Sequence, residues 1–271
     1  MSDPTRPIGP KIIAVVNQKG GVGKTTTTIN LGAALAELGF NVLLVDLDPQ
    51  GNASTGLGIS REKREMTTYD LLLDEAPIQN VVQRSNVDGL WIAPATTDLS
   101  SADIEMVSNE KRSYLLHDAL RDPKIDRFEL DYVLIDCPPS LSLLTVNAMV
   151  AAHSVLVPLQ SEFFALEGLS QLLLTVREIR ATANPELRIE GIVLTMFDVR
   201  NNLSRLVEVD ARNNLGDLVF KTLIPRNVRI SEAPSFAVPV LEYDSKSKGS
   251  QAYRALAEEM VALQGAEKSR G

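Results

Sequence analysis

The chain has 271 residues, of which 44% are apolar and 23% charged, a composition typical of a globular protein with a well-buried core. Its formal net charge of −8, taken alone, argues against a nucleic-acid binder. The segment 196–250, however, holds eight Lys/Arg against seven Asp/Glu, which permits a basic surface there. A single cysteine, Cys137, excludes an internal disulfide framework and any metal or iron–sulfur cage built from the cysteines of one chain. We interpret Cys137 as a small buried hydrophobic residue beside a strand end.

The first ten residues read MSDPTRPIGP, with three prolines and without the apolar segment of a secretory signal. We expect a flexible arm over residues 1–10, a single domain over residues 11–264 and a short tail over residues 265–271, although length alone also permits two small domains. No apolar run approaches the roughly 18 residues that span a bilayer. The sequence therefore predicts a cytoplasmic protein.

Short runs rich in β-branched residues alternate with longer helical patterns along the chain. The predicted strands are KIIAVVN, NVLLVDL, GLWIAP, DYVLIDC, HSVLVPL, RIEGIVLTMF and VFKTLIP. These runs are almost continuously apolar, which is typical of strands buried on both faces of a mainly parallel sheet. Helices are predicted between them over residues 25–38, 142–151, 166–181 and 203–215, and a last helix after residue 250. The alternation predicts a doubly wound α/β fold with helices on both faces, in which ligands bind at the carboxyl ends of the strands.

Between the first strand and the first helix lies the glycine-rich turn QKGGVGKTT. Such a turn directs successive backbone N–H groups and a helix N-terminus at a polyphosphate. We expect Gly20, Gly21 and Gly23 to allow left-handed dihedrals and close approach of the phosphates. Lys24 is expected to reach the β- and γ-phosphates, and Thr25 to give its hydroxyl to Mg²⁺. A glycine-rich turn alone is common, but the strand and helix around it argue against a chance match.

The turn departs from the pattern G-x-x-x-x-G-K-[ST] at one point: Gln18 stands in place of the first glycine, and Lys19 adds a cation. Carboxylates at two other strand ends complete a nucleotide site. Asp136 is expected to serve the magnesium shell, directly or through water, and Asp48 to orient an attacking water. Asp46, last in its apolar run, is interpreted either as structural or as a group that supports the ligands of the site from behind. The plain alternative for each is a carboxylate that caps a turn.

The segments KGGVGKTT, DLDPQGN and LIDCPPS resemble the ParA/MinD group of deviant Walker A P-loop ATPases. The resemblance implies that Lys19 is the lysine that crosses a dimer interface to touch the partner's nucleotide, so that ATP controls formation of a homodimer. There it would act in catalysis by neutralising charge that develops on the transferred phosphoryl group. The resemblance also implies ATP or ADP with Mg²⁺ as ligands and a nucleotide site formed by Lys19, Gly20, Gly21, Val22, Gly23, Lys24, Thr25 and Thr26.

Longer motifs over residues 11–263, including LQSEFFALEGLSQLLLTV, LTMFDVRNNLS and IPRNVRISEAPS, are similar to the small chromosomal, Soj-like ParA proteins. That branch implies a nucleoid-associated DNA-partitioning ATPase. Its ATP dimer binds double-stranded DNA without sequence preference, and a ParB-like centromere-binding protein and DNA accelerate its slow hydrolysis. The resemblance places Pro225 and Asn227 at the adenine, with a simple turn as the alternative. The DNA contacts that it implies are Arg200 and Arg229 and, by a looser match, Lys246 and Lys248, with exposed solvated charges as the alternative.

Other functions share this nucleotide loop. A MinD-like membrane-associated ATPase would need a basic amphipathic tail, whereas the last helix carries Glu258 and Glu259 opposite a stripe of Ala252, Leu256, Met260 and Leu263, which favours packing on its own domain. A nitrogenase-type iron protein would need two cysteines in each chain. An ATP-dependent metabolic amidoligase and a binding module without turnover remain as alternatives, and Asp48 argues against the second.

Overall fold

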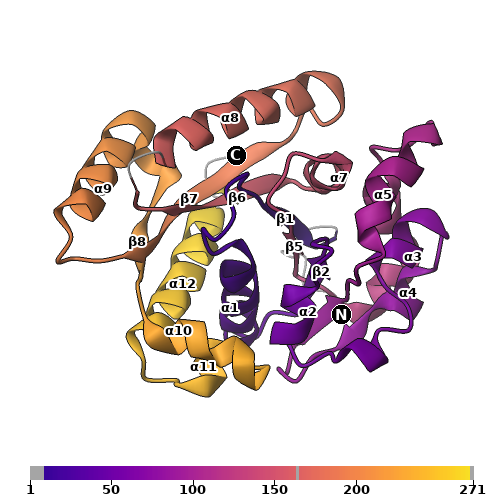
Figure 1. Ribbon diagram of the computed structural model, residues 1–271, viewed down its shortest axis with the longest axis horizontal. Helices are drawn as coiled ribbons and strands as arrows, with labels where there is room; N and C mark the ends of the chain where they lie inside the picture. The colour runs from indigo at the N-terminus through magenta and orange to yellow at the C-terminus, as the bar shows by residue number, and fades with distance from the viewer. Residues whose placement is uncertain (1–8, 163–164, 269–271) are drawn as a thin grey trace.

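The computed structural model describes residues 9–162 and 165–268. Most of the predicted N-terminal arm and the last three residues of the predicted tail therefore lie outside the described residues. The described chain forms one eight-stranded sheet with helices packed on both of its faces (Figure 1). The doubly wound α/β fold predicted from the sequence is confirmed.

The sheet has the strand order β3-β4-β2-β5-β1-β6-β7-β8. All neighbouring strands are parallel except β3 and β4. The strands span Lys11–Val15 (β1), Val42–Asp46 (β2), Gln83–Arg84 (β3), Leu90–Ala93 (β4), Tyr132–Asp136 (β5), Ser154–Gln160 (β6), Arg188–Phe197 (β7) and Val219–Pro225 (β8). The seven predicted strands are all present. The sequence did not show β3, because two residues are too few to display a hydrophobic pattern.

The α-helices differ widely in length. They span Lys24–Glu37 (α1), Asn52–Gly56 (α2), Thr68–Leu73 (α3), Ile78–Val81 (α4), Leu99–Glu105 (α5), Leu115–Ala119 (α6), Leu143–Ala151 (α7), Ala165–Thr182 (α8), Asn202–Leu215 (α9), Val228–Glu232 (α10), Val240–Tyr243 (α11) and Lys248–Lys268 (α12). The five predicted helices correspond to α1, α7, α8, α9 and α12. The helices α2 to α6 have only four to seven residues each, so none of them presents the repeated apolar spacing of a longer helix.

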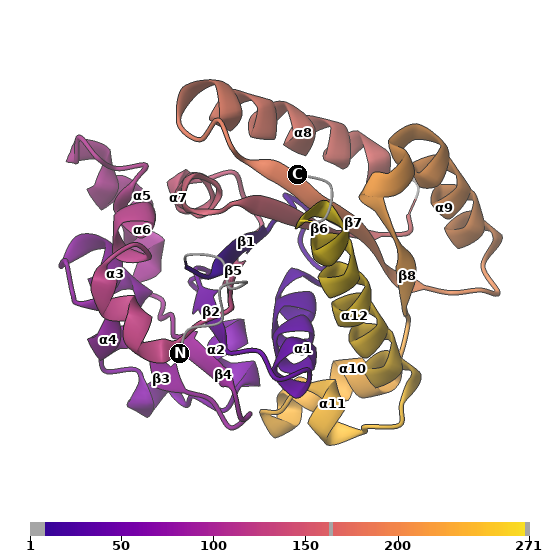
Figure 2. The same cartoon turned by 180° about the vertical axis from the view of Figure 1, so that it is seen from behind.

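Each face of the sheet has its own apolar core. On one face α1 and α12 lie side by side (Figures 1 and 2) and bury Leu31, Leu35, Tyr253 and Leu256 against the strands. The other core includes side chains of α3 and α5 to α9. The sheet is thus covered on both sides, as its continuously apolar strands require.

The last helix packs on its own domain, as predicted. Leu256 and Met260 of the predicted stripe are buried, but Leu263 is 49% exposed, because α12 extends past the core that covers its first turns. The helical segments of the described chain all fall short, in length or in apolar content, of a membrane span.

Candidate nucleotide site

The glycine-rich turn joins the end of β1 to the first turn of α1. Gly21 and Gly23 have φ angles of +75° and +88°, so both adopt the left-handed conformation that favours glycine. Gly20 does not adopt this conformation, so the expectation of a left-handed dihedral there is wrong. Of the three glycines, only Gly21 and Gly23 have a positive φ. A Cβ on Gly20 would lie 4.0 Å from the nearest atom, Cβ of Pro139, which is ordinary contact.

Lys24 is the first residue of α1 and is only 7% exposed. Its Nζ donates a hydrogen bond to the carbonyl of Lys19 at 3.1 Å. Burial lowers the pKa of the Lys24 ammonium, and the nearby Asp136, Cys137 and Asp48 oppose that shift. The buried ammonium of Lys24 therefore lies inside the phosphate loop, near the carboxylates of Asp136 and Asp48. An anion bound in the loop would offset the cost of burying this charge.

Lys19 lies at the rim of the same loop. Its backbone is anchored by Asn17, whose Oδ1 accepts from the Lys19 N–H at 3.0 Å and whose Nδ2 donates to the Pro158 carbonyl of β6 at 2.8 Å. The Lys19 side chain points outward and forms an ion pair of 2.7 Å with Glu162. Both partners of this ion pair are about half exposed. The loop thus presents one buried lysine and one exposed lysine.

Two carboxylates are fully buried at neighbouring strand ends. In the register of the sheet, Asp136 of β5 lies opposite both Val15 of β1 and Asp46 of β2. Burial, together with the charge of Asp46, raises the pKa of Asp136. Its Oδ1 accepts from Thr28 Oγ1 at 3.2 Å, whereas Oδ2 is buried and has no hydrogen-bond partner among the described residues. A buried carboxylate oxygen without a donor, beside the first turn of α1, fits a cation ligand.

Asp46 has a different environment, because its oxygens are already satisfied. Its Oδ2 accepts from the backbone N–H and the hydroxyl of Ser54, at 2.9 and 2.7 Å, and its Oδ1 accepts from the Asp48 N–H at 3.2 Å. Burial raises the pKa of Asp46 as well. These contacts agree with the structural interpretation of Asp46, which ties α2 and the Asp48 turn to the end of β2.

Asp48 lies in the turn that follows β2 and is 8% exposed. Its Oδ1 accepts from the Gln50 N–H at 2.9 Å, and its carbonyl accepts from the Gly51 N–H at 2.8 Å. Asp48 also acts electrostatically on Lys24. The structure therefore brings Lys24, Asp48 and Asp136 together, although they are separated by up to 112 residues in the sequence.

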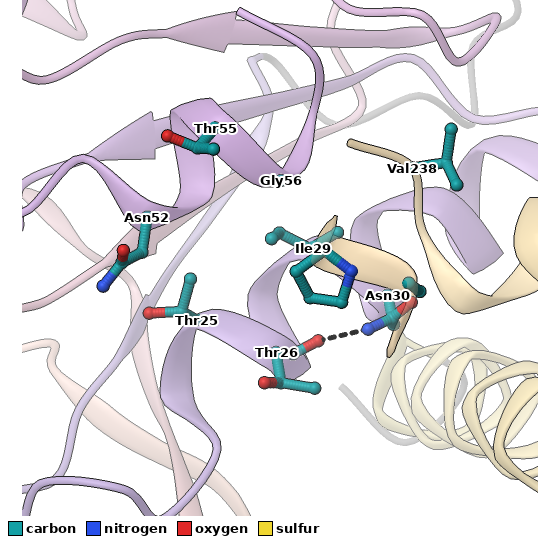
Figure 3. Close-up of a pocket in the computed structure, with 10 residues that line it drawn as sticks. Thr25, Thr26, Ile29, Asn30, Asn52, Thr55, Gly56 and Val238 are labelled. Carbon is teal, nitrogen blue, oxygen red and sulfur yellow. Dashed lines mark hydrogen bonds between the residues drawn. The ribbon is translucent and has the colours of Figure 1, made fainter. Parts of the chain in front are cut away.

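Two cavities flank this cluster. The first, of about 280 Å³, lies between α1, α2 and the segment after α10 (Figure 3). It is lined by Thr25, Thr26, Ile29, Asn30, Asn52, Thr55, Gly56, Ala233, Pro234 and Val238. The second, of about 320 Å³, is lined by Asp48, Pro49, Gln50, Leu99, Ser100, Asp103, Pro138, Pro139, Ser140, Ser142 and Leu144. Thr25 thus borders the first cavity and Asp48 borders the second, and both cavities are large enough to hold part of a ligand.

Pro225 and Asn227 line neither cavity. Pro225 ends β8 opposite Phe197, and Asn227 caps α10, where its Oδ1 accepts from the Arg229 N–H at 2.8 Å. Their contact with adenine stays a prediction. The capping role could have been found in the sequence, because Asn followed by a short helical segment is a common N-cap.

Arg200 and Arg229 both lie at the carboxyl edge of the sheet. They follow β7 and β8, which are parallel neighbours, and the Arg226 N–H donates to the Phe197 carbonyl between them at 3.0 Å. Arg200 pairs with Asp198 at 3.2 Å, and Arg229 pairs with Glu232 at 2.9 Å and Asp244 at 3.3 Å. Lys246 and Lys248 are exposed nearby in the sequence. Each arginine therefore has an acidic partner, which the sequence pattern did not predict.

Comparison with known proteins adds independent information. A family described as AAA domain matches residues 10–189. The chain is 56% identical to the chromosome partitioning protein ParA of Caulobacter vibrioides, over 93% of this chain and 94% of that protein. It is 51% identical to the sporulation initiation inhibitor protein Soj of Bacillus subtilis, over 93% and 98% of the two chains.

Solved structures show the same fold. The cobyrinic acid a,c-diamide synthase of Mycobacterium smegmatis, determined with bound ADP and magnesium, has a TM-score of 0.81 and 38% identity over 97% of both chains. The Pyrococcus furiosus cell division ATPase MinD has a TM-score of 0.77 and 28% identity, over 93% of this chain and 99% of that one. The likeness in both cases extends over nearly the whole chain.

Proposed function

The chain belongs to the ParA/Soj family of chromosome-partitioning ATPases, and we propose that it works as a nucleotide-switched DNA clamp. ATP binding joins two copies into a dimer that holds double-stranded DNA without sequence preference. Hydrolysis is slow in the isolated protein, is accelerated by DNA and a ParB-like partner, and releases the DNA. The protein is then associated with the nucleoid while ATP is bound.

The observation that carries the nucleotide part of this proposal is the cluster of Lys24, Asp48 and Asp136 around the phosphate loop. We infer that residues 19–26 bind ATP or ADP, as the related diamide synthase binds ADP with magnesium. Thr25 and Asp136 would hold Mg²⁺, and the unpartnered Oδ2 of Asp136 is the atom that fits this role, directly or through water. Bound magnesium would neutralise phosphate charge during transfer.

Different residues of the chain then have different roles in hydrolysis. The backbone N–H groups of the turn and the ammonium of Lys24 hold the phosphates. Asp48, 8% exposed and fixed by its turn, accepts a hydrogen bond from the attacking water and aims it along the reaction axis. Lys24 also stabilises negative charge that develops on the transferred phosphoryl group.

Lys19 acts across the dimer. Its present partner, Glu162, is a half-exposed carboxylate, and such surface ion pairs contribute only about 0–1 kcal/mol. Exchanging Glu162 for the phosphates of a second subunit therefore costs little. Because each copy would donate its Lys19 to the other's nucleotide, dimerisation requires ATP.

The DNA face consists of Arg200 and Arg229, with Lys246 and Lys248 as further phosphate contacts. A dimer presents each of these cations twice, which raises the affinity that one subunit's modest local charge allows. Such binding depends on phosphate neutralisation and falls as salt rises.

An ATP-dependent amidoligase is the second candidate, because the solved diamide synthase is 38% identical to this chain. The relatives named ParA and Soj are more similar, at 51–56% identity. An amidoligase that draws ammonia from glutamine through a thiol needs a reactive cysteine, whereas Cys137 is fully buried and burial raises its pKa. ATP consumption that requires ammonia and a carboxylic acid, and not DNA, would favour this candidate.

The proposal is tested by retention of non-specific duplex DNA in ATP, in ADP and without nucleotide, each over a salt series. We expect retention only in ATP, with a steep loss as salt increases. Arg200→Ala combined with Arg229→Ala should abolish retention while ATP hydrolysis in the absence of DNA is unchanged. Equal retention in all three nucleotide states, or full retention by the double variant, would contradict the clamp.

A further inference from the structure

Arg64 is a buried cation that the nucleotide site does not include. It is 7% exposed, whereas the other charged residues of the run REKRE, residues 61–65, are exposed. Its Nε and Nη2 donate to the Ile59 carbonyl at 3.1 and 2.8 Å, and its Nη1 donates to the Ala95 carbonyl at 2.9 Å. Its Nη2 also donates to Thr55 Oγ1 at 2.8 Å.

All of these acceptors are neutral. Within residues 9–162 and 165–268, no carboxylate accepts a hydrogen bond from Arg64. Burying a charge is costly unless it is well hydrogen-bonded, and a neutral side chain of similar size would avoid that cost. The charge of the nearby Asp46 offsets part of this cost. In addition, the rigid fork of the guanidinium can hold several groups in position at once.

The hydrogen bonds continue from Arg64 to the turn that carries Asp48. Thr55 Oγ1, which accepts from Arg64, donates to the Gly51 carbonyl at 3.1 Å. The Gly51 N–H in turn donates to the Asp48 carbonyl at 2.8 Å. The hydrogen bonds thus run from Arg64 to Thr55, from Thr55 to Gly51 and from Gly51 to Asp48. The guanidinium is coupled to Asp48 through two intervening residues.

Gly51 also makes direct contact with the guanidinium. Its φ of +61° is left-handed, and a Cβ there would lie 2.3 Å from Arg64 Nη1 and 2.8 Å from the Ala95 carbonyl oxygen. The arginine therefore packs against the bare Cα of Gly51. Any movement of the fork would move the start of α2, of which Gly51 is the N-cap.

A second set of hydrogen bonds connects α2 to Ala95, which lies in the loop after β4 and also accepts from Arg64. The Ala95 N–H donates to Ser54 Oγ at 3.0 Å, and Ser54 donates to Asp46 as described above. The helix between these contacts, α2, has only five residues, too few to be stable by its own hydrogen bonds. Its conformation, and with it the Asp48 turn, therefore depends on tertiary contacts, among which are the hydrogen bonds of Arg64 and Ser54.

We propose that Arg64 is a positioning residue for ATP hydrolysis, which fixes the Asp48 turn through Thr55 and Gly51. This inference rests on the role proposed above for Asp48 in orienting the attacking water. Displacement of a reacting group by about 1 Å can lower a rate by about 100-fold, so a loosened turn lowers kcat without weakening nucleotide binding.

The test uses Thr55, because removing Arg64 would leave the Ile59 and Ala95 carbonyls unsatisfied and endanger folding. Thr55→Val keeps the shape and deletes the hydroxyl, whereas Thr55→Ser keeps the hydroxyl. We expect Thr55→Val to lower kcat for ATP about tenfold or more with an unchanged KM, and Thr55→Ser to stay within about threefold of the parent.

Thr182→Val is the matched control. Its hydroxyl makes the same kind of bond, to the Glu178 carbonyl one turn earlier at 2.8 Å, on an exposed part of α8. This variant should lose no activity, and thermal unfolding should show all three variants folded at the assay temperature. A raised KM with an unchanged kcat in Thr55→Val would overturn the inference, since it would mean a binding contact. Equal losses in Thr55→Val and Thr55→Ser would overturn it too.

A double-mutant cycle with Asp48→Asn separates this inference from the proposed function. If Thr55 acts through Asp48, adding Thr55→Val to Asp48→Asn lowers the residual kcat by less than about twofold. Independent, multiplicative losses would contradict the positioning role while leaving the role of Asp48 intact. Full activity of Asp48→Asn by itself would instead reject the role proposed for Asp48, and this inference with it.

Discussion

If Arg200 contacts DNA as proposed, Asp198 is placed to set the strength of that contact. The Arg200 side chain is 87% exposed, yet its Nε and Nη2 both donate to the Asp198 carboxylate, at 3.2 Å each. These hydrogen bonds hold the pKa of Asp198 below its usual range, so the carboxylate is charged at neutral pH. A DNA phosphate that binds at the proposed face would therefore have to displace or share this partner before Arg200 contributes its full charge.

Asp198→Asn removes the competing charge but keeps an oxygen that can accept from the Arg200 N–H, as Asp198 Oδ1 does at 3.0 Å. Because exposed ion pairs are worth up to about 1 kcal/mol, we expect DNA retention in ATP to strengthen by about two- to fivefold. The measurement is the apparent Kd at fixed salt. Glu208→Gln, which breaks the Glu208–Arg212 pair of α9, should leave it unchanged. Unaltered affinity in Asp198→Asn, where Arg200→Ala weakens binding, would show that the two side chains do not compete.

At the scale of elements, α12 protects the edge of the sheet. The strand β8 is an edge strand, and edge strands leave backbone groups without partners in the sheet. Glu259 of α12 accepts from the Lys221 N–H at 2.7 Å and from the Thr222 N–H and hydroxyl at 2.9 and 2.7 Å. The helix thus holds the strand that leads directly to the IPRNV segment and Arg229.

Glu259→Gln should lower the free energy of unfolding by about 1–3 kcal/mol, because it replaces charge-assisted hydrogen bonds with weaker neutral ones. Thermal unfolding would report this as a fall in Tm of roughly 2–4 °C for each kcal/mol. The neighbouring Glu258 is exposed, so Glu258→Gln provides the control and should leave Tm within about 1 °C. Equal Tm values for both variants would mean that β8 does not depend on Glu259.

At the scale of the whole molecule, the residues proposed for ATP hydrolysis and those proposed for DNA binding lie at the same carboxyl edge of the sheet. The phosphate loop and the Asp48 turn follow β1 and β2, and Asp136 ends β5, whereas Arg200 and Arg229 follow β7 and β8. Parallel strands bring all of these loops to one edge of the same sheet. Nucleotide and DNA would therefore act on loops at one edge of the same sheet, with only β6 between β1 and β7, which offers a short physical connection between hydrolysis and release.

Lys19→Ala should prevent ATP-driven dimerisation, because it removes the cation proposed to reach the partner's nucleotide. In light scattering with ATP and Mg²⁺, the parent protein is expected at twice the monomer mass and the variant at the monomer mass. Lys221→Ala removes another exposed lysine, far from the loop in sequence, and should dimerise like the parent. A dimer of Lys19→Ala that is as stable as the parent's would reject the proposed role of Lys19.

The amino-acid sequence determined the features that depend on contiguous residues. The apolar strands, the long helices and the phosphate loop each consist of one uninterrupted stretch, so hydrophobic period and glycine spacing were enough to predict them. The same holds for Lys24 and Thr25, which belong to the phosphate loop motif itself, and for Asp48 and Asp136, which follow or end a buried strand.

Only the tertiary structure decided which polar groups meet. Arg64 belongs to a charged run that reads as solvated, and it is buried because Thr55, Ile59 and Ala95 converge around it from separate segments. Glu162 beside Lys19 and Glu259 beside β8 are likewise distant in sequence from their partners. The helices α2 to α6 are too short to be stable alone, so their formation depends on packing against the finished sheet. Local patterns therefore fix the framework, whereas the partners of individual charges emerge only when distant segments come together.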